Sequence, residues 1–258
     1  MIIQMDTLGN ILSLGKMQDG LFFDCDGYNA GSVTIVMPIE SYSTVVGIDE
    51  MGNLIVQAQG NVTYYDSGIK AGKVSAFGTT NVSYFEYGVK AGKVSEVGSF
   101  SIDYYEYGAK AGKICRVGGY SVDYNEYGAN MGKPSKVGYN SISYYDYGMK
   151  AGKISAIGPI SVDYYETGAN VGKVCRFGSG TSVRYNDFGN DMGKVSCIGI
   201  SSVDYYTYGA KAGMPSYCGQ ERMDYYDYGI KAGKLSQISY SSVDYYEYGA
   251  HAGKVRCL

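Results

Sequence analysis

The chain has 258 residues, a formal net charge of −3, and a composition rich in glycine (38) and tyrosine (30) with no tryptophan. The small negative charge excludes a general electrostatic attraction to nucleic acid or to anionic membranes. No signal peptide is predicted at the N-terminus, and no apolar stretch is long enough to span a bilayer. These features leave the compartment unknown, with the cytoplasm as the default, and we expect no nucleic-acid partner and no membrane span.

Residues 1–57 have the composition of a β segment. Leu21–Asp24 and Ser32–Met37 are rich in apolar and β-branched residues and are predicted strands, with Pro38 closing the second. Residues 6–15 look like a shortened repeat of the kind that follows. Because terminal repeats are usually atypical, we expect residues 1–57 to form a diverged capping segment for an array that occupies residues 58–258.

The array is a unit of about twenty residues that occurs ten times. We number its positions 1 to 20 and its copies 1 to 10. Position 1 falls at Asn61, Asn81, Ser101, Ser121, Ser141, Ser161, Ser182, Ser202, Arg222 and Ser242. The step is twenty residues, with one slip to twenty-one near Gly180. A fixed period of this size is typical of repeat architectures, in which each unit packs mainly on its neighbours.

Each copy is predicted to contain two strands and two turns. Positions 8 and 12 are glycine in all ten copies, and position 18 is glycine in eight of the nine copies that reach it, Ser239 being the exception. Repeated glycine indicates positive φ or close backbone approach. Positions 2–7, typified by Val-Asp-Tyr-Tyr-Glu-Tyr, and positions 13–17, typified by Lys-Val-Ser-x-Val, have strand composition.

Strict alternation predicts which side chains point inward. Position 2 is apolar and position 4 is tyrosine in every copy, and position 17 is also apolar. We predict that positions 2, 4, 15 and 17 face inward, that positions 3, 5 and 7 share the other face, and that the variable position 16 is solvated.

Two arrangements of the copies are consistent with these patterns. The first is a β-solenoid, in which each position lies above itself in the next coil. The second is a continuous antiparallel hairpin meander, which the short turns allow. The acidic residues at position 6 and the lysines at position 13 favour hairpins, because direct stacking would place like charges together. The predicted fold class is all-β with solenoid stacking, and the meander is the alternative.

Tyrosines at positions 5 and 7 are candidates for an exposed aromatic face. Of the thirty tyrosines, twenty-four lie at positions 4, 5 and 7. Adjacent aromatic rows on a sheet suit sugar rings, ice or a second copy of the same face, although they also form ladders within a sheet. The candidate residues are Tyr105, Tyr107, Tyr145, Tyr147, Tyr206, Tyr208, Tyr226, Tyr228, Tyr246 and Tyr248.

Catalytic and metal-binding patterns are missing from the sequence. The single histidine, His251, is at position 10, where six copies have lysine, and is interpreted as a substitution in a turn. The cysteines have no metal-ligand spacing, and we expect them to be reduced single substitutions. We predict no cofactor, no metal and no enzymatic activity. The cysteines are Cys25, Cys115, Cys175, Cys197, Cys218 and Cys257.

The array ends on a second strand. Leu258 falls at position 17 and no polar segment follows it, so we expect an association edge made of Lys254, Val255, Arg256, Cys257 and Leu258. Such an edge meets a partner, is covered by the chain's own fold or aggregates. We expect it to mediate self-association, either as a dimer or as a filament.

Several bacterial repeats resemble this pattern. Residues 225–234, Tyr-Tyr-Asp-Tyr-Gly-Ile-Lys-Ala-Gly-Lys, are similar to the tyrosine and glycine rhythm of choline-binding and clostridial-toxin cell-wall repeats. Residues 6–10 resemble the Tyr-Asp repeats of shell-forming toxins. Most of the chain resembles uncharacterised bacterial proteins with Tyr-Asp-x-x-Gly-x-Val-x-x-Ile-Gly repeats, which implies a β-repeat fold and no particular activity.

Three functions are consistent with the sequence. The leading hypothesis is a structural, self-assembling β-repeat protein whose partner is another copy of itself. The second is an adhesin-like module that binds a polysaccharide or a surface, and the third is an ice-binding face.

Overall fold

The computed structural model describes six short N-terminal strands and residues 60–258. The N-terminal strands form one sheet in the order β3-β2-β1-β6-β5-β4. β3 coincides with the predicted strand, whereas residues 6–10, Cys25 and residues 32–36 of the second predicted strand lie outside the described residues. The six strands are β1 (Ile2–Met5), β2 (Ile11–Gln18), β3 (Leu21–Asp24), β4 (Met37–Pro38), β5 (Val46–Ile48) and β6 (Leu54–Gln57).

The array contributes nineteen strands, β7–β25, to one antiparallel sheet, and a further pair, β26 and β27. The part of the chain that the structure describes contains no α-helix. The all-β prediction is confirmed. The strands are β7 (Val62–Tyr64), β8 (Val74–Phe77), β9 (Thr80–Tyr84), β10 (Val94–Val97), β11 (Phe100–Tyr104), β12 (Ile114–Val117), β13 (Tyr120–Tyr124), β14 (Pro134–Val137), β15 (Asn140–Tyr144), β16 (Ile154–Ile157), β17 (Ile160–Tyr164), β18 (Val174–Phe177), β19 (Thr181–Tyr185), β20 (Val195–Ile198), β21 (Ser201–Tyr205), β22 (Pro215–Cys218), β23 (Glu221–Tyr225), β24 (Leu235–Ile238), β25 (Ser241–Ser242), β26 (Asp244–Tyr245) and β27 (Val255–Cys257).

Two glycine-dependent turns connect the strands of the array. The longer one begins at position 8, where glycine has φ between +72° and +82° in all ten copies. In six copies it includes one 3-10 turn: η1 (Gly68–Lys70), η2 (Gly88–Lys90), η3 (Gly108–Lys110), η4 (Gly148–Lys150), η5 (Gly209–Lys211) and η6 (Gly229–Lys231). The shorter one begins at position 18 and has two residues, or three between Phe177 and Thr181. There Ser239, with φ +50°, is the one non-glycine residue with positive φ in the described chain.

A β-bulge in every copy changes the inward face of the second strand. In copy 3, Ile102 is opposite Val117 and Asp103 is opposite Arg116, but Tyr104 is opposite Ile114, so Cys115 is an extra residue on its strand. The bulge brings positions 14 and 17 to the same side, and position 14 is buried in all ten copies. The prediction that position 15 faces inward is therefore wrong, because strict alternation does not continue across a bulge.

The core consists of positions 2, 4, 14 and 17. Val62, Val122 and Met223 at position 2 have no exposed surface, and eight of the ten tyrosines at position 4 are buried. Position 16 is exposed in several copies, as predicted, although Cys197 there is buried. Val56 of β6 belongs to the same cluster of buried residues, so the N-terminal sheet meets the array through at least this side chain.

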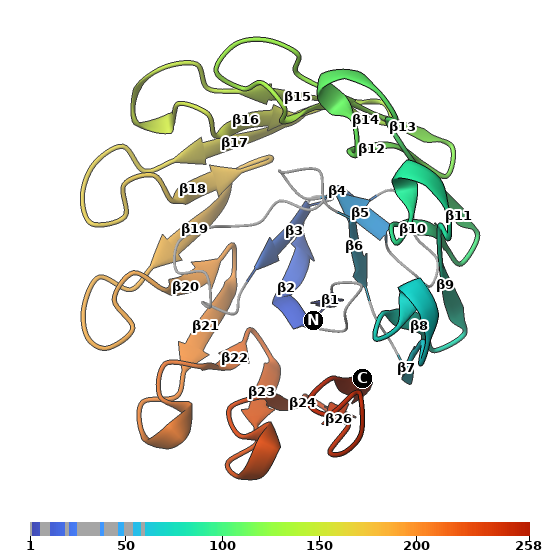
Figure 1. Ribbon diagram of the computed structural model, residues 1–258. Helices are drawn as coiled ribbons and strands as arrows, with labels where there is room; N and C mark the ends of the chain where they lie inside the picture. Colours follow the sequence, from blue (N-terminus) through green and yellow to red (C-terminus); the bar gives the residue numbers. More distant parts are fainter. Residues whose placement is uncertain are drawn as a thin grey trace.

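The array follows a circular path that returns the last copy to the first (Figure 1). The backbones of Gly60 and Leu258 exchange two hydrogen bonds, of 3.2 and 3.0 Å, and Asn61 is bridged to Cys257. These pairs match the pairs made by positions 20 and 17 and by positions 1 and 16 at interior junctions.

Candidate functional site

A repeated set of highly exposed aromatic side chains lies at position 7, just before the long turn. The backbone at Tyr107 is extended, with φ −133° and ψ 164°, and Gly108 then has φ +75°. A Cβ added at Gly108 would meet nothing within 4 Å, so the required backbone conformation rather than space accounts for the glycine. This change of direction carries the side chain of Tyr107 into solvent.

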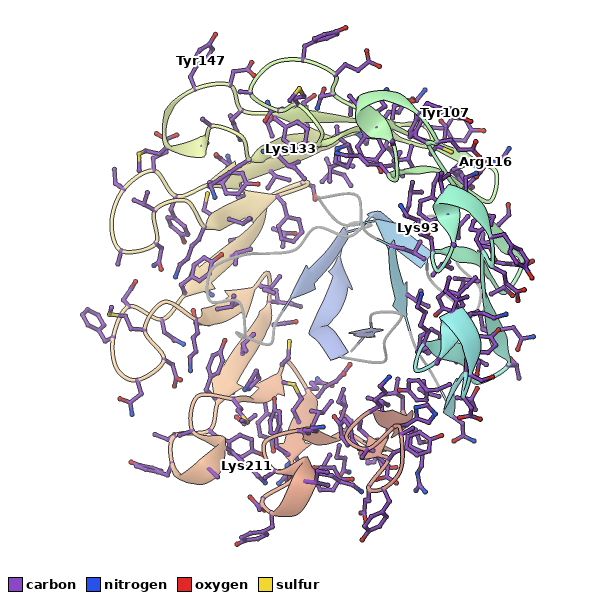
Figure 2. The ribbon with its side chains drawn as sticks, in the orientation of Figure 1. Lys93, Tyr107, Arg116, Lys133, Tyr147 and Lys211 are labelled. Carbon is purple, nitrogen blue, oxygen red and sulfur yellow. The ribbon has the colours of Figure 1, made fainter. Side chains whose placement is uncertain are left out.

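Eight such side chains form what we call the aromatic belt. Each is 84–88% exposed. Figure 2 shows Tyr107 and Tyr147 at the outer edge of the circular array, directed away from it. Copies 1 and 6 have Ser67 and Thr167 at this position. The aromatic belt is Tyr87, Tyr107, Tyr127, Tyr147, Phe188, Tyr208, Tyr228 and Tyr248.

Position 5 does not belong to this exposed face. Tyr105, a typical member, is half-buried, and its hydroxyl donates a 3.1 Å hydrogen bond to the carbonyl of Val122 in the next copy. Its ring makes an edge-to-face contact with Tyr124, 6.2 Å between centroids. Burial raises the pKa of the Tyr105 hydroxyl. Of the ten candidate tyrosines, these five are thus contacts between copies: Tyr105, Tyr145, Tyr206, Tyr226 and Tyr246.

Position 4 tyrosines connect the copies in the opposite direction. The hydroxyl of Tyr84 donates a 2.9 Å hydrogen bond to the carbonyl of Val74 in the preceding copy. Lys73, also from that copy, lies 5.1 Å from the centre of the Tyr84 ring and donates to the carbonyl of Gly92. A Cβ at Gly92 would approach the Lys73 Nζ to 2.9 Å and displace the end of that side chain, whereas the φ of +79° is what requires glycine at position 12.

Lysine at position 10 forms an ion-pair network with the following copy. Lys90 Nζ is 2.5 Å from an Asp103 oxygen and 2.9 Å from a Glu106 oxygen. Hydrogen bonds to these two carboxylates raise the pKa of Lys90, and the hydrogen bond from Lys90 lowers the pKa of Asp103. Position 6 carboxylates beside the aromatic belt are therefore largely neutralised, as in the pairs Lys70–Glu86, Lys110–Glu126, Lys150–Glu166, Lys211–Asp227 and Lys231–Glu247.

The predicted association edge is occupied by copy 1. Tyr64 donates a 2.7 Å hydrogen bond to the carbonyl of Val255, and Lys254 donates to the carbonyl of Gly72. Together with the Gly60–Leu258 hydrogen bonds, these contacts cover the strand at 254–258. The expectation of a free C-terminal edge is wrong, because the curvature of the array brings its own first copy to that edge.

His251 lies in the same junction rather than in an isolated turn. Its Nε2 is 3.1 Å from an Asp66 oxygen, and its ring stacks on Tyr64 at 4.9 Å. Asp66 is at position 6 of copy 1, so His251 replaces the usual lysine in the ion-pair network. His251 therefore contributes to the contact between copies 10 and 1. The sequence signal for this role is the lysine that six other copies have at position 10, opposite a carboxylate at position 6 of the next copy.

Five cysteines are described, and all are free thiols: Cys115, Cys175, Cys197, Cys218 and Cys257. Burial raises the pKa of the Cys115 and Cys175 thiols. Within the described residues, no three His, Cys, Asp or Glu side chains are grouped so that they could hold a metal. No helix in this part of the chain is long and apolar enough to cross a membrane.

Comparison with models of known protein families gives no match, and comparison with curated proteins likewise gives none.

Proposed function

We propose that this protein is a non-enzymatic, multivalent binding scaffold whose aromatic belt contacts a neutral polysaccharide. We further propose that the array is an antiparallel hairpin meander bent into a ring, rather than a solenoid. The observation that carries the functional proposal is the repetition of one almost fully exposed ring in eight of ten copies. Exposed rings that make no contribution to the core are unusual in such number, and large exposed apolar features mark interaction sites.

The chemistry of the belt supports a neutral, repeating ligand. Aromatic faces suit the apolar faces of sugar rings, and in nine of the ten copies a carboxylate at position 6 directly precedes the belt position. Because lysine neutralises most of these carboxylates, the surface offers hydrogen-bond acceptors without a strong net field. Weak equivalent sites on a rigid scaffold combine into strong binding when the ligand also repeats.

The test is sedimentation of the protein with insoluble cellulose, chitin and β-1,3-glucan. We expect binding to at least one of them. A variant with Tyr107→Ser, Tyr127→Ser and Tyr147→Ser should bind at least about tenfold more weakly, since each lost stacking contact is worth about 0.5–1.5 kcal/mol. Serine is the residue that copy 1 has at this position, so the turn should tolerate it.

The matched control replaces three position 16 side chains, Glu96→Ser, Arg116→Ser and Lys136→Ser, which are exposed but not aromatic. It should bind like the wild type. Failure of the wild type to bind any of the three polymers, or equal binding by the tyrosine variant, would contradict the proposal.

Self-assembly through the same belt is the second candidate. The observation that favours it is the presence of exposed apolar residues at position 9 in copies 1, 2, 5 and 9: Ile69, Val89, Met149 and Ile230 are 51–76% exposed. Larger apolar patches are typical of protein association surfaces. Sedimentation velocity separates the two functions, because assembly requires concentration-dependent oligomers that the three-tyrosine variant should lose.

A further inference from the structure

Copy 7 departs from the repeat more than any other interior copy. Position 3 is Arg184, whereas six copies have Asp there and three have Ser or Thr. Position 5 is Asn186 instead of an aromatic residue, and position 10 is Asp191 instead of lysine. The extra residue of the array precedes the same copy, where Phe177 and Thr181 enclose a turn of three residues. Changes concentrated in one place create a site that the repeat pattern does not provide elsewhere.

A pocket of about 520 Å³ lies at this place, between copies 6 and 7 and the start of copy 8. Its lining includes Tyr165, Arg184, Asp187, Ser196, Cys197 and Ser202. At regular junctions, a position 10 lysine meets carboxylates of the next copy. Here position 10 of copy 6 is Asn170, whose side-chain amide donates to Asp187 at 3.3 Å. The smaller side chain replaces a lysine that pairs with two carboxylates at other junctions.

Arg184 differs from the other four arginines in its partners. Arg116, Arg176, Arg222 and Arg256 each form an ion pair with an aspartate at position 3. The guanidinium of Arg184 donates instead to the sulfur of Cys197, directly across the strand pair, at 3.4 Å. Among the described residues it has no ion-pair partner, so its guanidinium is available to a ligand in the pocket, which Asp187 also lines.

We propose that this pocket binds a small hydroxylated carboxylate, of the class of sugar acids. A guanidinium presents parallel donors that match a carboxylate. Asp187 in the same lining opposes a doubly charged ligand such as phosphate, and the hydroxyls of Ser196 and Ser202 suit ligand hydroxyl groups. The proposal depends on the pocket that copy 7 forms with its two neighbours and is independent of the aromatic belt.

The experiment is isothermal titration calorimetry with sodium D-glucuronate, compared with D-glucose and inorganic phosphate. Glucuronate should bind saturably with one site per chain, and glucose and phosphate should bind at least about tenfold more weakly. Arg184→Ser should lose at least about tenfold in affinity, the usual consequence of removing a charged hydrogen-bond donor. Serine occurs at this position in copies 2 and 5, which favours normal folding.

Two further variants keep the result interpretable. Arg116→Ser removes an exposed arginine that is already paired, and it should bind glucuronate like the wild type. Asp187→Asn removes the opposing charge and should tighten binding, a gain that misfolding cannot produce. The proposal is overturned if glucuronate does not bind, if glucose binds equally well, or if affinity is unchanged in both Arg184→Ser and Asp187→Asn.

Discussion

The junction between copies 10 and 1 and the junctions inside the array are built from the same contacts. At both, a position 4 tyrosine donates to the position 14 carbonyl of the copy before it, as in Tyr64–Val255 and Tyr84–Val74. A position 13 lysine lies over that tyrosine, at 5.0 Å for Lys254. The difference is at position 10, where His251 replaces lysine.

The same residues at the same repeat positions therefore form a junction whether the two copies are adjacent in sequence or at opposite ends of the array. Position 5 hydroxyl bonds span 17 residues inside the array and 184 residues at the terminal junction. By the logarithmic dependence of loop-closure entropy on length, the longer closure costs about 2 kcal/mol more. We therefore expect the terminal junction to open before any interior junction.

The largest effect should come from the core tyrosines, which both kinds of junction share. Tyr164→Ala removes a buried ring and should lower the free energy of unfolding by about 3–5 kcal/mol. Tyr147→Ala removes an exposed ring of the aromatic belt and should change it by no more than about 0.5 kcal/mol. Urea denaturation followed by circular dichroism measures both values. Equal losses for the two variants would show that the assignment of faces is wrong.

The next largest loss of stability should come from removing the position 13 lysine, either at an interior junction or at the terminal junction. Lys113→Met removes a hydrogen bond to the carbonyl of Gly132 and a contact with the ring of Tyr124, and Lys254→Met removes the equivalent contacts with copy 1. Each should cost about 1–2 kcal/mol. Methionine is already present at this position in copy 8, so steric strain is not expected.

Hydrogen exchange distinguishes the two lysine variants. After Lys254→Met, faster exchange should be confined to copies 1 and 10, whereas Lys113→Met should accelerate exchange in copies 3 and 4. Uniform acceleration along the array in the Lys254→Met variant would contradict the idea of a separable terminal junction.

Acidification should weaken the interior junctions because it protonates the aspartates at position 3. The pKa of Asp163 is lowered from 3.8, chiefly by its hydrogen bond with Lys150. A carboxyl group with a lowered folded-state pKa stabilises the fold above its unfolded pKa, and this stabilisation is lost as the pH falls through the folded value. Stability should therefore decline below about pH 4. The terminal junction lacks this source of sensitivity, because position 3 of copy 1 is Thr63.

Melting temperatures between pH 7 and pH 3 test this account. Asp163→Ser should be less stable than the wild type at pH 7 and should lose less on acidification. The control is Glu96→Ser, which removes an exposed carboxylate at position 16 and should follow the wild-type curve. If both variants follow the wild-type curve, the ion pair makes no contribution.

The smallest effect should come from replacing His251 with lysine, the residue that six interior junctions have at position 10. His251→Lys allows an ion pair with Asp66 like those at six interior junctions, and at pH 8 it should slow exchange in copies 1 and 10. An exposed ion pair is worth about 0.2–1 kcal/mol, so the slowing should be less than about sixfold. Faster exchange in these copies would mean that stacking of His251 on Tyr64 is worth more than the ion pair.

Much of the fold could be predicted from the repeat itself. The period, the two strands per copy and the glycine turns depend on local sequence, and the buried position 4 tyrosines follow from their invariance among copies. Position 15 could not be assigned, because a bulge such as the one at Cys115 adds a residue without altering composition. Position 5 was assigned to the exposed face because alternation ignores the next copy, on which Tyr105 packs.

The return of the array to its start was also missed, because curvature accumulates from small rotations that no single copy displays. A signal was nevertheless present. Inside the array, where position 10 is not lysine, position 3 of the next copy is Asp in only one of three cases, and Asn130 is followed by Ser143. His251 and Thr63 follow the same rule across the ends of the array. The pocket at Arg184 cannot be predicted from the repeat, because its lining comes from three copies that only the fold places side by side.

A disulfide across the terminal junction tests most directly that the array returns to its first copy. Asn61 and Cys257 flank the doubly hydrogen-bonded pair Gly60 and Leu258, so their Cα atoms should be about 4.5 Å apart, within the range that a disulfide spans. The interior equivalent, Glu96→Cys with Ser101→Cys, is the positive control.

The measurement is peptide mass spectrometry of the Asn61→Cys variant after mild oxidation at low protein concentration. The account predicts an intramolecular link between residues 61 and 257, formed as readily as the 96–101 control. A control that forms while residue 257 stays reduced, or links only between molecules, would contradict the account.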